Sequence, residues 1–161
     1  MNLNLFFTPT DILLPAHADM RRWSVIACDQ FTADAGYWQA VQDTVCDAPS
    51  TLRLMLPEFY LGKCDEAAAT REIQQTMRRY LDDGVFRTVP HSLVLVQRTL
   101  PGGAVRCGVV GALDLEAYDY APDSVTPIRA TEGTVASRLP ARVRIRAAAA
   151  LEMPHIIVFY S

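Results

Sequence analysis

The sequence has no long hydrophobic run and no secretory signal. None of its apolar stretches approaches the roughly 20 residues that are needed to cross a bilayer. The opening segment Met1–Leu5 has neither a basic start nor a cleavage site. We therefore expect a soluble, cytoplasmic protein that has no membrane partner.

Clustered metal ligands and common catalytic motifs are also missing. The four cysteines are spread too widely for a zinc knuckle or a CxxC motif, and the three histidines are too few for a histidine-rich metal site. The sequence contains no P-loop, GxGxxG, GxSxG, HExxH or EF-hand pattern. We assign no metal, and we expect the cysteines to be buried or unreactive thiols.

The sequence has fewer basic than acidic residues, with 15 lysines and arginines against 18 aspartates and glutamates. The net charge of −3 argues against nucleic acid as a partner, because binding to phosphate backbones depends on positive charge. Half of the residues are hydrophobic and a fifth are charged, which is typical of a folded protein. At 161 residues, a single domain over 1–161 is expected.

Hydrophobic periodicity predicts an α/β fold of the mixed α+β kind. We expect an antiparallel, hairpin-containing sheet with helices packed on it, incomplete at the C-terminus. The clearest helix runs over 65–83, with Gly84 in position to end it. Two other helices are expected. One begins after a cap at Thr32 or Asp34 and ends at residue 45, and the other covers 140–150. Extended or strand segments are expected at 23–28, 51–60, 93–96, 105–115 and 155–160.

Two of these strands form the predicted hairpin. They are joined by Leu100-Pro101-Gly102-Gly103, in which proline and glycine suit the central positions of a turn. Gly108 and Gly111 fall in the second strand. A bulge would explain these two glycines, and so would the close approach of a ligand or of another backbone.

Arginines are concentrated between 129 and 146, where Glu132 is the only acid. The planar guanidinium group binds phosphate or carboxylate in a bidentate manner. Together with the Thr131 and Thr134 hydroxyls, these arginines could hold a phosphorylated small molecule, and Glu132 could act as general base for transfer to an alcohol. A solvated basic face that pairs with acids elsewhere explains the same arginines. The arginines are Arg129, Arg138, Arg142, Arg144 and Arg146.

Asp29 and Gln30 form a second candidate site. They follow the predicted strand 23–28, and strand ends commonly deliver polar side chains to a binding site. A helix cap formed by the aspartate explains the same residues.

Long strings of the sequence resemble the amino-terminal half of a bacterial and archaeal family called domain of unknown function 1015. The resemblance covers essentially the whole chain and implies that it is the first part of a longer domain. The strings are residues 23–32, 49–52, 56–58, 128–135, 138–146 and 151–156.

The resemblance also implies a function. Members of the family are longer, and their second half carries an Asp-Gly-Asn-His or Asp-Gly-His-His motif like that of ParB and sulfiredoxin-like proteins, where the motif helps bind phosphate. This chain lacks the motif and departs from the family after Ile156, which implies a truncated product or a fragment. Similarity to ParB-like free-serine kinases implies a phosphotransferase that acts on a hydroxyl-bearing metabolite such as serine, with ATP, ADP or pyrophosphate as donor.

Two hypotheses follow for this chain. The first is the remnant of such a kinase, inactive alone, which retains part of the site: Arg129, Thr131, Glu132, Arg138 and Arg142. The second is a non-catalytic module that binds an anionic small molecule or a protein. Because 155–160 is apolar, we also expect self-association through this segment.

Overall fold

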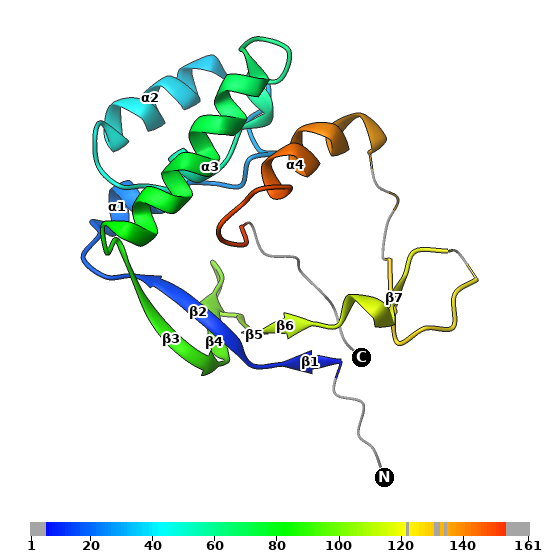
Figure 1. Ribbon diagram of the computed structural model, residues 1–161. Coiled ribbons are helices and arrows are strands. Elements are labelled where there is room, and N and C mark those ends of the chain that lie inside the picture. The colour runs from blue at the N-terminus through cyan, green and yellow to red at the C-terminus, as the bar shows by residue number, and fades with distance from the viewer. Residues whose placement is uncertain (1–5, 122, 131–132, 134, 154–161) are drawn as a thin grey trace. The chain divides into compact units, whose positions relative to one another are not determined.

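The computed structural model describes residues 6–121, 123–130, 133 and 135–153 (Figure 1). These residues form helices and small, mostly antiparallel sheets, which confirms the mixed α/β fold class. The chain divides into two compact units. The strand unit comprises Met1–Leu14 with Arg87–Thr134, and the helical unit comprises Pro15–Phe86 with Val135–Ser161. The single-domain expectation stays a prediction.

The helical unit contains four α-helices and three short 3-10 turns among the described residues. Its helices are α1 (Met20–Trp23), α2 (Ala35–Val45), α3 (Glu66–Asp82) and α4 (Leu139–Arg146). Its 3-10 turns are η1 (Thr51–Leu54), η2 (Glu58–Tyr60) and η4 (Ala136–Arg138). The helices expected over 34–45 and 65–83 are confirmed. Asp34 and Asp65 cap them, and Gly84 follows α3 with a φ of +67°.

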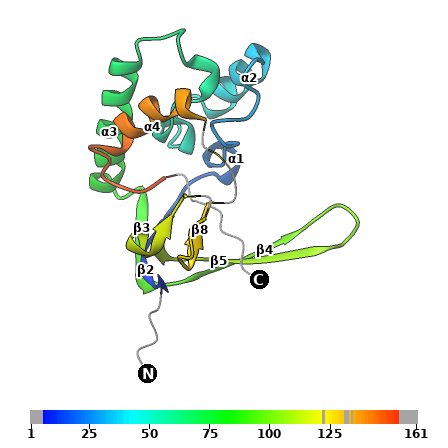
Figure 2. The same cartoon turned by 90° about the vertical axis from the view of Figure 1, so that its right-hand side faces the viewer.

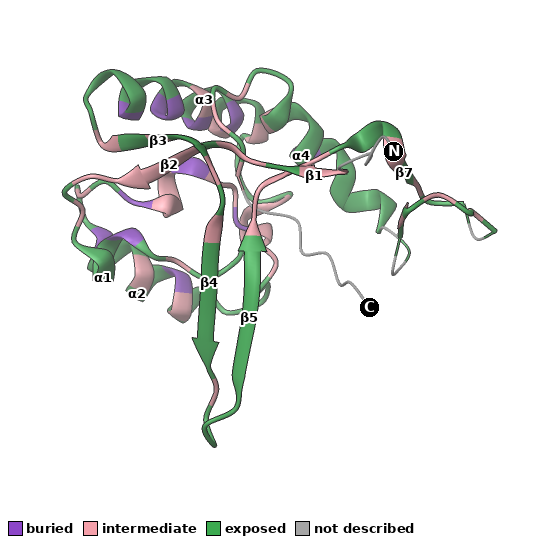
Figure 3. Cartoon of the chain, turned by 90° about the horizontal axis from the view of Figure 1, so that it is seen from below, coloured by how far each residue is buried: buried purple, intermediate pink, exposed green. Residues whose placement is uncertain are grey.

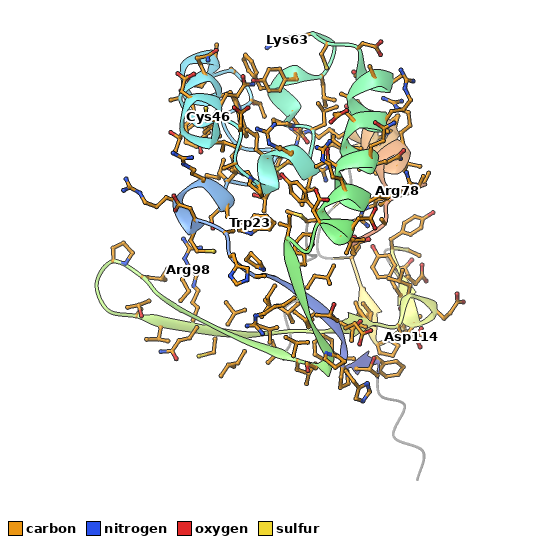
Figure 4. The ribbon with its side chains drawn as sticks, turned by 60° about the vertical axis from the view of Figure 1, so that its left-hand side comes forward. Trp23, Cys46, Lys63, Arg78, Arg98 and Asp114 are labelled. Carbon is orange, nitrogen blue, oxygen red and sulfur yellow. The ribbon has the colours of Figure 1, made fainter. Side chains whose placement is uncertain are left out.

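The core of this unit is built on one face of α3. Ile73, Met77 and Tyr80 are buried there, together with Leu54 from η1 and Trp23 from α1. The indole ring of Trp23 (Figure 4) lies 6.2 Å from the ring of Tyr80. Apolar residues from α4 and the segment after it pack against this cluster, so α4 covers one side of the core.

The buried strand predicted at 23–28 is wrong, because no strand forms there. Residues 24–27 have no regular structure and the chain turns at 28–30. The Thr51 hydroxyl donates to the Trp23 carbonyl at 2.8 Å and accepts from the Val25 N–H at 3.3 Å. Side-chain hydrogen bonds therefore replace those of a neighbouring strand. The extended segment predicted at 51–60 is also wrong, since η1 and η2 occupy most of it.

Helix α4 is shorter than predicted, because it ends at Arg146 and leaves the alanine run outside. The side-chain amide of Gln74 donates to the carbonyls of Arg144 and Ile145, at 2.9 and 3.0 Å. Arg78 of α3 (Figure 4) donates to the carbonyl of Ala148 at 3.2 Å. Side chains of α3 thus satisfy carbonyls at the end of α4, where the helix leaves them without backbone partners.

The strand unit consists of paired short strands. The antiparallel hairpin predicted from the sequence is confirmed as β4 paired with β5. Strands β1 and β6 are antiparallel, β2 is hydrogen-bonded to β3, and β7 and β8 are parallel. Their bounds are β1 (Phe7–Thr8), β2 (Thr10–Pro15), β3 (Phe86–Ser92), β4 (Val94–Thr99), β5 (Val105–Val110), β6 (Ala112–Leu113), β7 (Tyr118–Asp119) and β8 (Ile128–Arg129), and the 3-10 turn η3 covers Leu115–Ala117.

Glycines shape the hairpin and its exit. Gly102 has a φ of +95°, and the N–H of Gly103 donates to the carbonyl of Leu100 at 3.0 Å, which is the turn expected there. A Cβ atom at Gly111 would lie 2.7 Å from the backbone oxygen of Thr8. Gly111 therefore permits close approach of another backbone, whereas Gly108 has no such neighbour within 4 Å.

Two expectations concern other parts of the chain. The strand predicted at 155–160 lies outside the described residues. Among the helices that the structure describes, none combines the length and the apolar composition required to span a membrane.

Candidate functional site

A nearly buried carboxylate, that of Glu58, organises the candidate site in the helical unit. Pro57 precedes it with a φ of −58°, and the Glu58 N–H donates to the carbonyl of Cys28 at 2.8 Å. This hydrogen bond fixes the start of η2 against the turn at 28–30. The Glu58 side chain is only 7% exposed, so its charge requires partners.

Two arginines supply those partners, one to each carboxylate oxygen. Arg138 Nε lies 3.2 Å from Oε2 of Glu58, and Arg142 Nη2 donates to Oε1 at 2.9 Å. Arg138 is the last residue of η4, and Arg142 lies one turn further along in α4. Residues four apart share a face of a helix, and Pro140, with its fixed φ, suits the first turn between them.

The guanidinium groups remain accessible at this site. The side chains of Arg138 and Arg142 are 45% and 47% exposed. Each guanidinium has five N–H donors, and within the described residues Glu58 is the one side chain that forms an ion pair with these two groups. Two positive charges therefore lie beside one negative charge, and the half-exposed guanidinium groups keep donors that Glu58 does not use.

The Cys28 thiol is the third component of the site. Burial raises the pKa of this thiol above its ordinary value, and the positive charge of Arg142 opposes the effect. The negative charges of Asp29 and Glu58 raise the pKa further. Cys28 is thus a neutral, half-buried group at neutral pH and does not add a charge to the arginine pair.

The structure brings together some of the predicted site residues. Arg138 and Arg142 converge on Glu58, and the charge of Asp29 acts on the neighbouring Cys28 thiol. The side-chain amide of Gln30 donates to the Asp29 carboxylate at 3.2 Å. The predicted helix cap is formed by Asp34 rather than by Asp29.

The remaining predicted residues belong to the other unit or lie outside the described residues. Arg129 belongs to the strand unit, where it is exposed in β8 and lies opposite Asp119 of β7. Thr131 and Glu132 lie outside the described residues. Their roles in a site stay predictions.

The other arginines of the segment also contact acids. Arg144 pairs with Glu66, and Arg146 Nη2 lies 2.6 Å from Oε1 of Glu152. These ion pairs are compatible with both explanations of the arginine segment, a binding site and a solvated basic face. A guanidinium group that contacts one carboxylate keeps further N–H donors for a ligand.

Sequence reasoning missed Glu58 as a site residue. Its partner Arg142 is 84 positions away, and no local pattern links an isolated acid to a distant arginine. The only available signal was the string Leu56-Pro57-Glu58, which contributed to the family resemblance without a role of its own.

One groove of the helical unit lies apart from this site. A groove of about 490 Å³ lies between α2, η1 and α3, and its lining shares no residue with the site around Glu58. Within residues 6–121, 123–130, 133 and 135–153, no group of three or more histidine, cysteine or acidic side chains is placed to hold a metal ion.

Comparison with known proteins assigns the sequence of this chain to a family. The model of the family described as protein of unknown function (DUF1015) matches residues 9–161, which is nearly the whole chain. No curated protein and no solved structure matches the chain.

Proposed function

The chain belongs to the DUF1015 family, and from this premise we propose that it binds a small phosphorylated metabolite through Arg138 and Arg142. One observation carries the proposal: a single carboxylate holds two half-exposed guanidinium groups on one face of the chain. The pair is pre-organised, so an incoming phosphate does not bear the whole entropic cost of ordering two long side chains.

The charge balance supports an anionic ligand. Glu58 neutralises one of the two arginines, which leaves an excess of one positive charge within this group of three side chains, while the negative charge of Asp29 acts on the adjoining Cys28 thiol. Phosphate accepts several hydrogen bonds at once, and the planar guanidinium group matches its geometry. Because the arginines are exposed, the attraction should weaken as salt screens it.

Phosphotransfer is the further step of the proposal. In that reaction Arg138 and Arg142 would offset charge on the moving phosphoryl group, and Arg129 and Thr131 would assist them. Glu132 would take the proton from a hydroxyl-bearing substrate such as serine, with ATP, ADP or pyrophosphate as phosphoryl donor. The support for this step is the clustering of these residues in the sequence and the family resemblance.

A non-catalytic binding module is the second candidate, and one observation favours it. The acid that the structure places beside the arginines is Glu58, and both of its oxygens are occupied by ion pairs. A carboxylate held in this way is poorly placed to accept a substrate proton. The described residues therefore support binding of the anion more directly than chemistry on it.

Titration calorimetry with inorganic phosphate and with phosphoserine at low salt tests the binding proposal. Arg142→Ala should weaken binding about 10-fold to 100-fold, the scale for losing a charge-assisted hydrogen bond. Arg144→Ala is the matched control, because Arg144 lies on the same helix but pairs with Glu66. Equal losses in both variants would show a general charge effect and would overturn the proposed site.

A turnover assay separates the two candidates. The chain and a full-length relative are incubated with serine and each of the three donors, and phosphoserine is measured. Glu132→Gln should abolish product in any protein that forms it, while phosphate affinity is kept or increased. Phosphate binding without phosphoserine from either protein would leave the binding module as the function.

A further inference from the structure

A small cleft in the helical unit lies between α2 and the segment formed by α1 and the residues after it. Helices α1 and α2 lie next to each other (Figure 2), and residues from 21–26 and 37–45 line the cleft. We call it the α1–α2 cleft. Its volume is about 210 Å³, and its lining shares no residue with the site around Glu58. An apolar cavity on the order of 150 Å³ holds benzene, so a ligand of similar size fits here.

Most of the lining of the cleft is apolar. Aliphatic side chains supply five of its nine lining residues, which are Val25, Ile26, Ala40, Val41 and Val45. Val45 is buried, whereas Val41 is partly buried and Ile26 is 38% exposed. Figure 3 shows that α2 carries buried, intermediate and exposed residues, so part of its apolar surface stays in contact with water. A short hydrocarbon chain in the cleft would remove this surface from water, which is favourable.

Two polar side chains from the α1 side of the cleft are available to a ligand. Arg21 and Ser24 are three positions apart, and both line the cleft. Within the described residues, no hydrogen bond or ion pair engages either side chain. The hydroxyl of Thr44, a third polar lining residue, already donates to the carbonyl of Ala40 at 2.8 Å. The guanidinium group of Arg21 and the hydroxyl of Ser24 therefore keep their donors for a ligand.

The charge at the cleft is positive. Arg21 is the one charged residue among those that line it. The nearest acid in the sequence is Asp19, whose carboxylate accepts a hydrogen bond from the Arg21 backbone N–H at 3.0 Å and lies 3.8 Å from Nε of Arg22. One acid and two arginines leave an excess of one positive charge. Asp43 of α2 does not line the cleft, and it accepts a hydrogen bond from the side chain of Gln39. An anionic head group therefore suits this cleft.

We propose that the α1–α2 cleft binds a short aliphatic carboxylate of about four to six carbon atoms, close to benzene in size. The carboxylate would accept hydrogen bonds from the guanidinium group of Arg21, whose planar fork matches its two oxygens, and from the hydroxyl of Ser24. The hydrocarbon chain would pack on Val41 and Val45. A phosphate monoester is less suitable, because it carries a charge of about −1.5 to −2 at pH 7 and the lining offers a single arginine.

A titration followed by two-dimensional NMR of the ¹⁵N-labelled chain tests the proposal. The ligands are acetate, butanoate, pentanoate and the neutral analogue pentan-1-ol. Pentanoate should bind with a dissociation constant in the millimolar range and shift the amide signals of residues 24–26 and 40–45. Affinity should rise about 2-fold to 4-fold with each methylene group from acetate to pentanoate, because each one buries apolar surface. Pentan-1-ol should bind at least about 5-fold more weakly than pentanoate, because it has no charge for Arg21.

Two matched pairs of variants separate the cleft from a general charge effect. Arg21→Gln should weaken pentanoate binding at least about 5-fold, whereas Arg22→Gln should change it less than about 2-fold, because Arg22 lies outside the lining and pairs with Asp19. Ala40→Leu should block the cleft from an exposed position of α2, whereas Gln39→Leu, next to it but outside the lining, should leave binding unchanged. The dispersion of the amide signals shows whether each variant keeps the fold.

Several outcomes would overturn the proposal. Equal affinities of acetate and pentanoate would show that the hydrocarbon chain is not bound, and equal affinities of pentan-1-ol and pentanoate would show that the charge is not recognised. Equal losses in Arg21→Gln and Arg22→Gln would indicate attraction to positive charge in general. Amide shifts centred on Glu58 and Arg142 would place the carboxylate at the other arginine site. An Ala40→Leu variant that binds as tightly as the wild type would exclude the cleft.

Discussion

Replacing Glu58 with glutamine tests whether one carboxylate holds Arg138 and Arg142 together. The substitution keeps the size of the side chain but removes its charge and one of its two acceptor oxygens. The new amide nitrogen would face a guanidinium group, and neither can accept a hydrogen bond from the other. At least one ion pair is therefore lost, and the other becomes a hydrogen bond to a neutral oxygen.

The expected cost follows from the burial of the three side chains. A hydrogen bond to a charged group contributes about 1.5–3 kcal/mol, and a fully exposed ion pair contributes about 1 kcal/mol or less. Glu58 is 7% exposed, but its two arginine partners are 45% and 47% exposed, so water replaces part of what they lose. We expect Glu58→Gln to lower the free energy of unfolding by about 1–3 kcal/mol.

Urea denaturation followed by circular dichroism measures this loss. Glu66→Gln is the control, because the side chain of Glu66 is 29% exposed and forms its ion pair with Arg144 alone, while the hydrogen bond it accepts from the Gly62 N–H can be kept by the amide oxygen. Its loss should be about 1 kcal/mol or less. A double-mutant cycle adds a second test, in which Glu58→Gln and Arg142→Ala should be non-additive. Equal losses of unfolding free energy at the two glutamates, or full additivity in the cycle, would refute the view that Glu58 holds Arg138 and Arg142 together.

Four further predictions follow from other contacts. Gly111→Ala should lower the free energy of unfolding by about 1–3 kcal/mol, because the new Cβ atom would meet the Thr8 backbone. Gly108→Ala should be neutral or stabilising, and the urea midpoints of the two variants test the difference. Gln74→Ala should lower it by about 1 kcal/mol, because two carbonyls at the end of α4 lose their donor, and the same assay applies. Cys28 should react with iodoacetamide at pH 8 more slowly than the exposed Cys107, because burial raises the pKa of the Cys28 thiol. Mass spectrometry over a time course measures both rates, and equal rates would contradict the prediction. The Ala121 N–H donates a hydrogen bond to the Asp119 carboxylate and lowers the pKa of this carboxyl below its ordinary 3.8. The ionised carboxylate therefore stabilises the folded protein above pH 3.8, and this stabilisation is lost as the pH falls through the folded-state pKa. Asp119→Asn should then lower the thermal midpoint at pH 6, and this loss should shrink as the pH is lowered below 3.8.

The elements predicted well from the sequence are those that depend on local signals. The helix over 65–83 has an aspartate cap, an apolar stripe and a terminal glycine, and all of these act within a few residues. The hairpin depends on a short turn between two apolar runs. The expected strand at 23–28 failed because its backbone is satisfied by Thr51, whose contact with Trp23 spans 28 positions. Local pattern does not report such a partner.

In the candidate site, the arginines were predictable from the sequence and their acidic partner was not. A concentration of arginines within one segment pointed to Arg138 and Arg142, because spacing along the sequence is enough to see it. Their acidic partner was not visible, since Glu58 lies in a separate segment and is brought to them only by the packing of α4 near η2. Electrostatic partners of this kind become evident only when the tertiary structure is known.

The separation between Glu58 and Arg142 has a consequence for synthesis of the protein on the ribosome. The two residues are 84 positions apart, and Gln74 is 70 positions from the carbonyl of Arg144 that it holds. At roughly 5–20 residues per second, Glu58 would leave the ribosome about 4–17 s before Arg142, and Gln74 of α3 about 4–14 s before Arg144. During that interval the carboxylate has no arginine and one side of the α3 core faces water. Docking of α4 would then be the step that pairs the carboxylate and covers this side of the core.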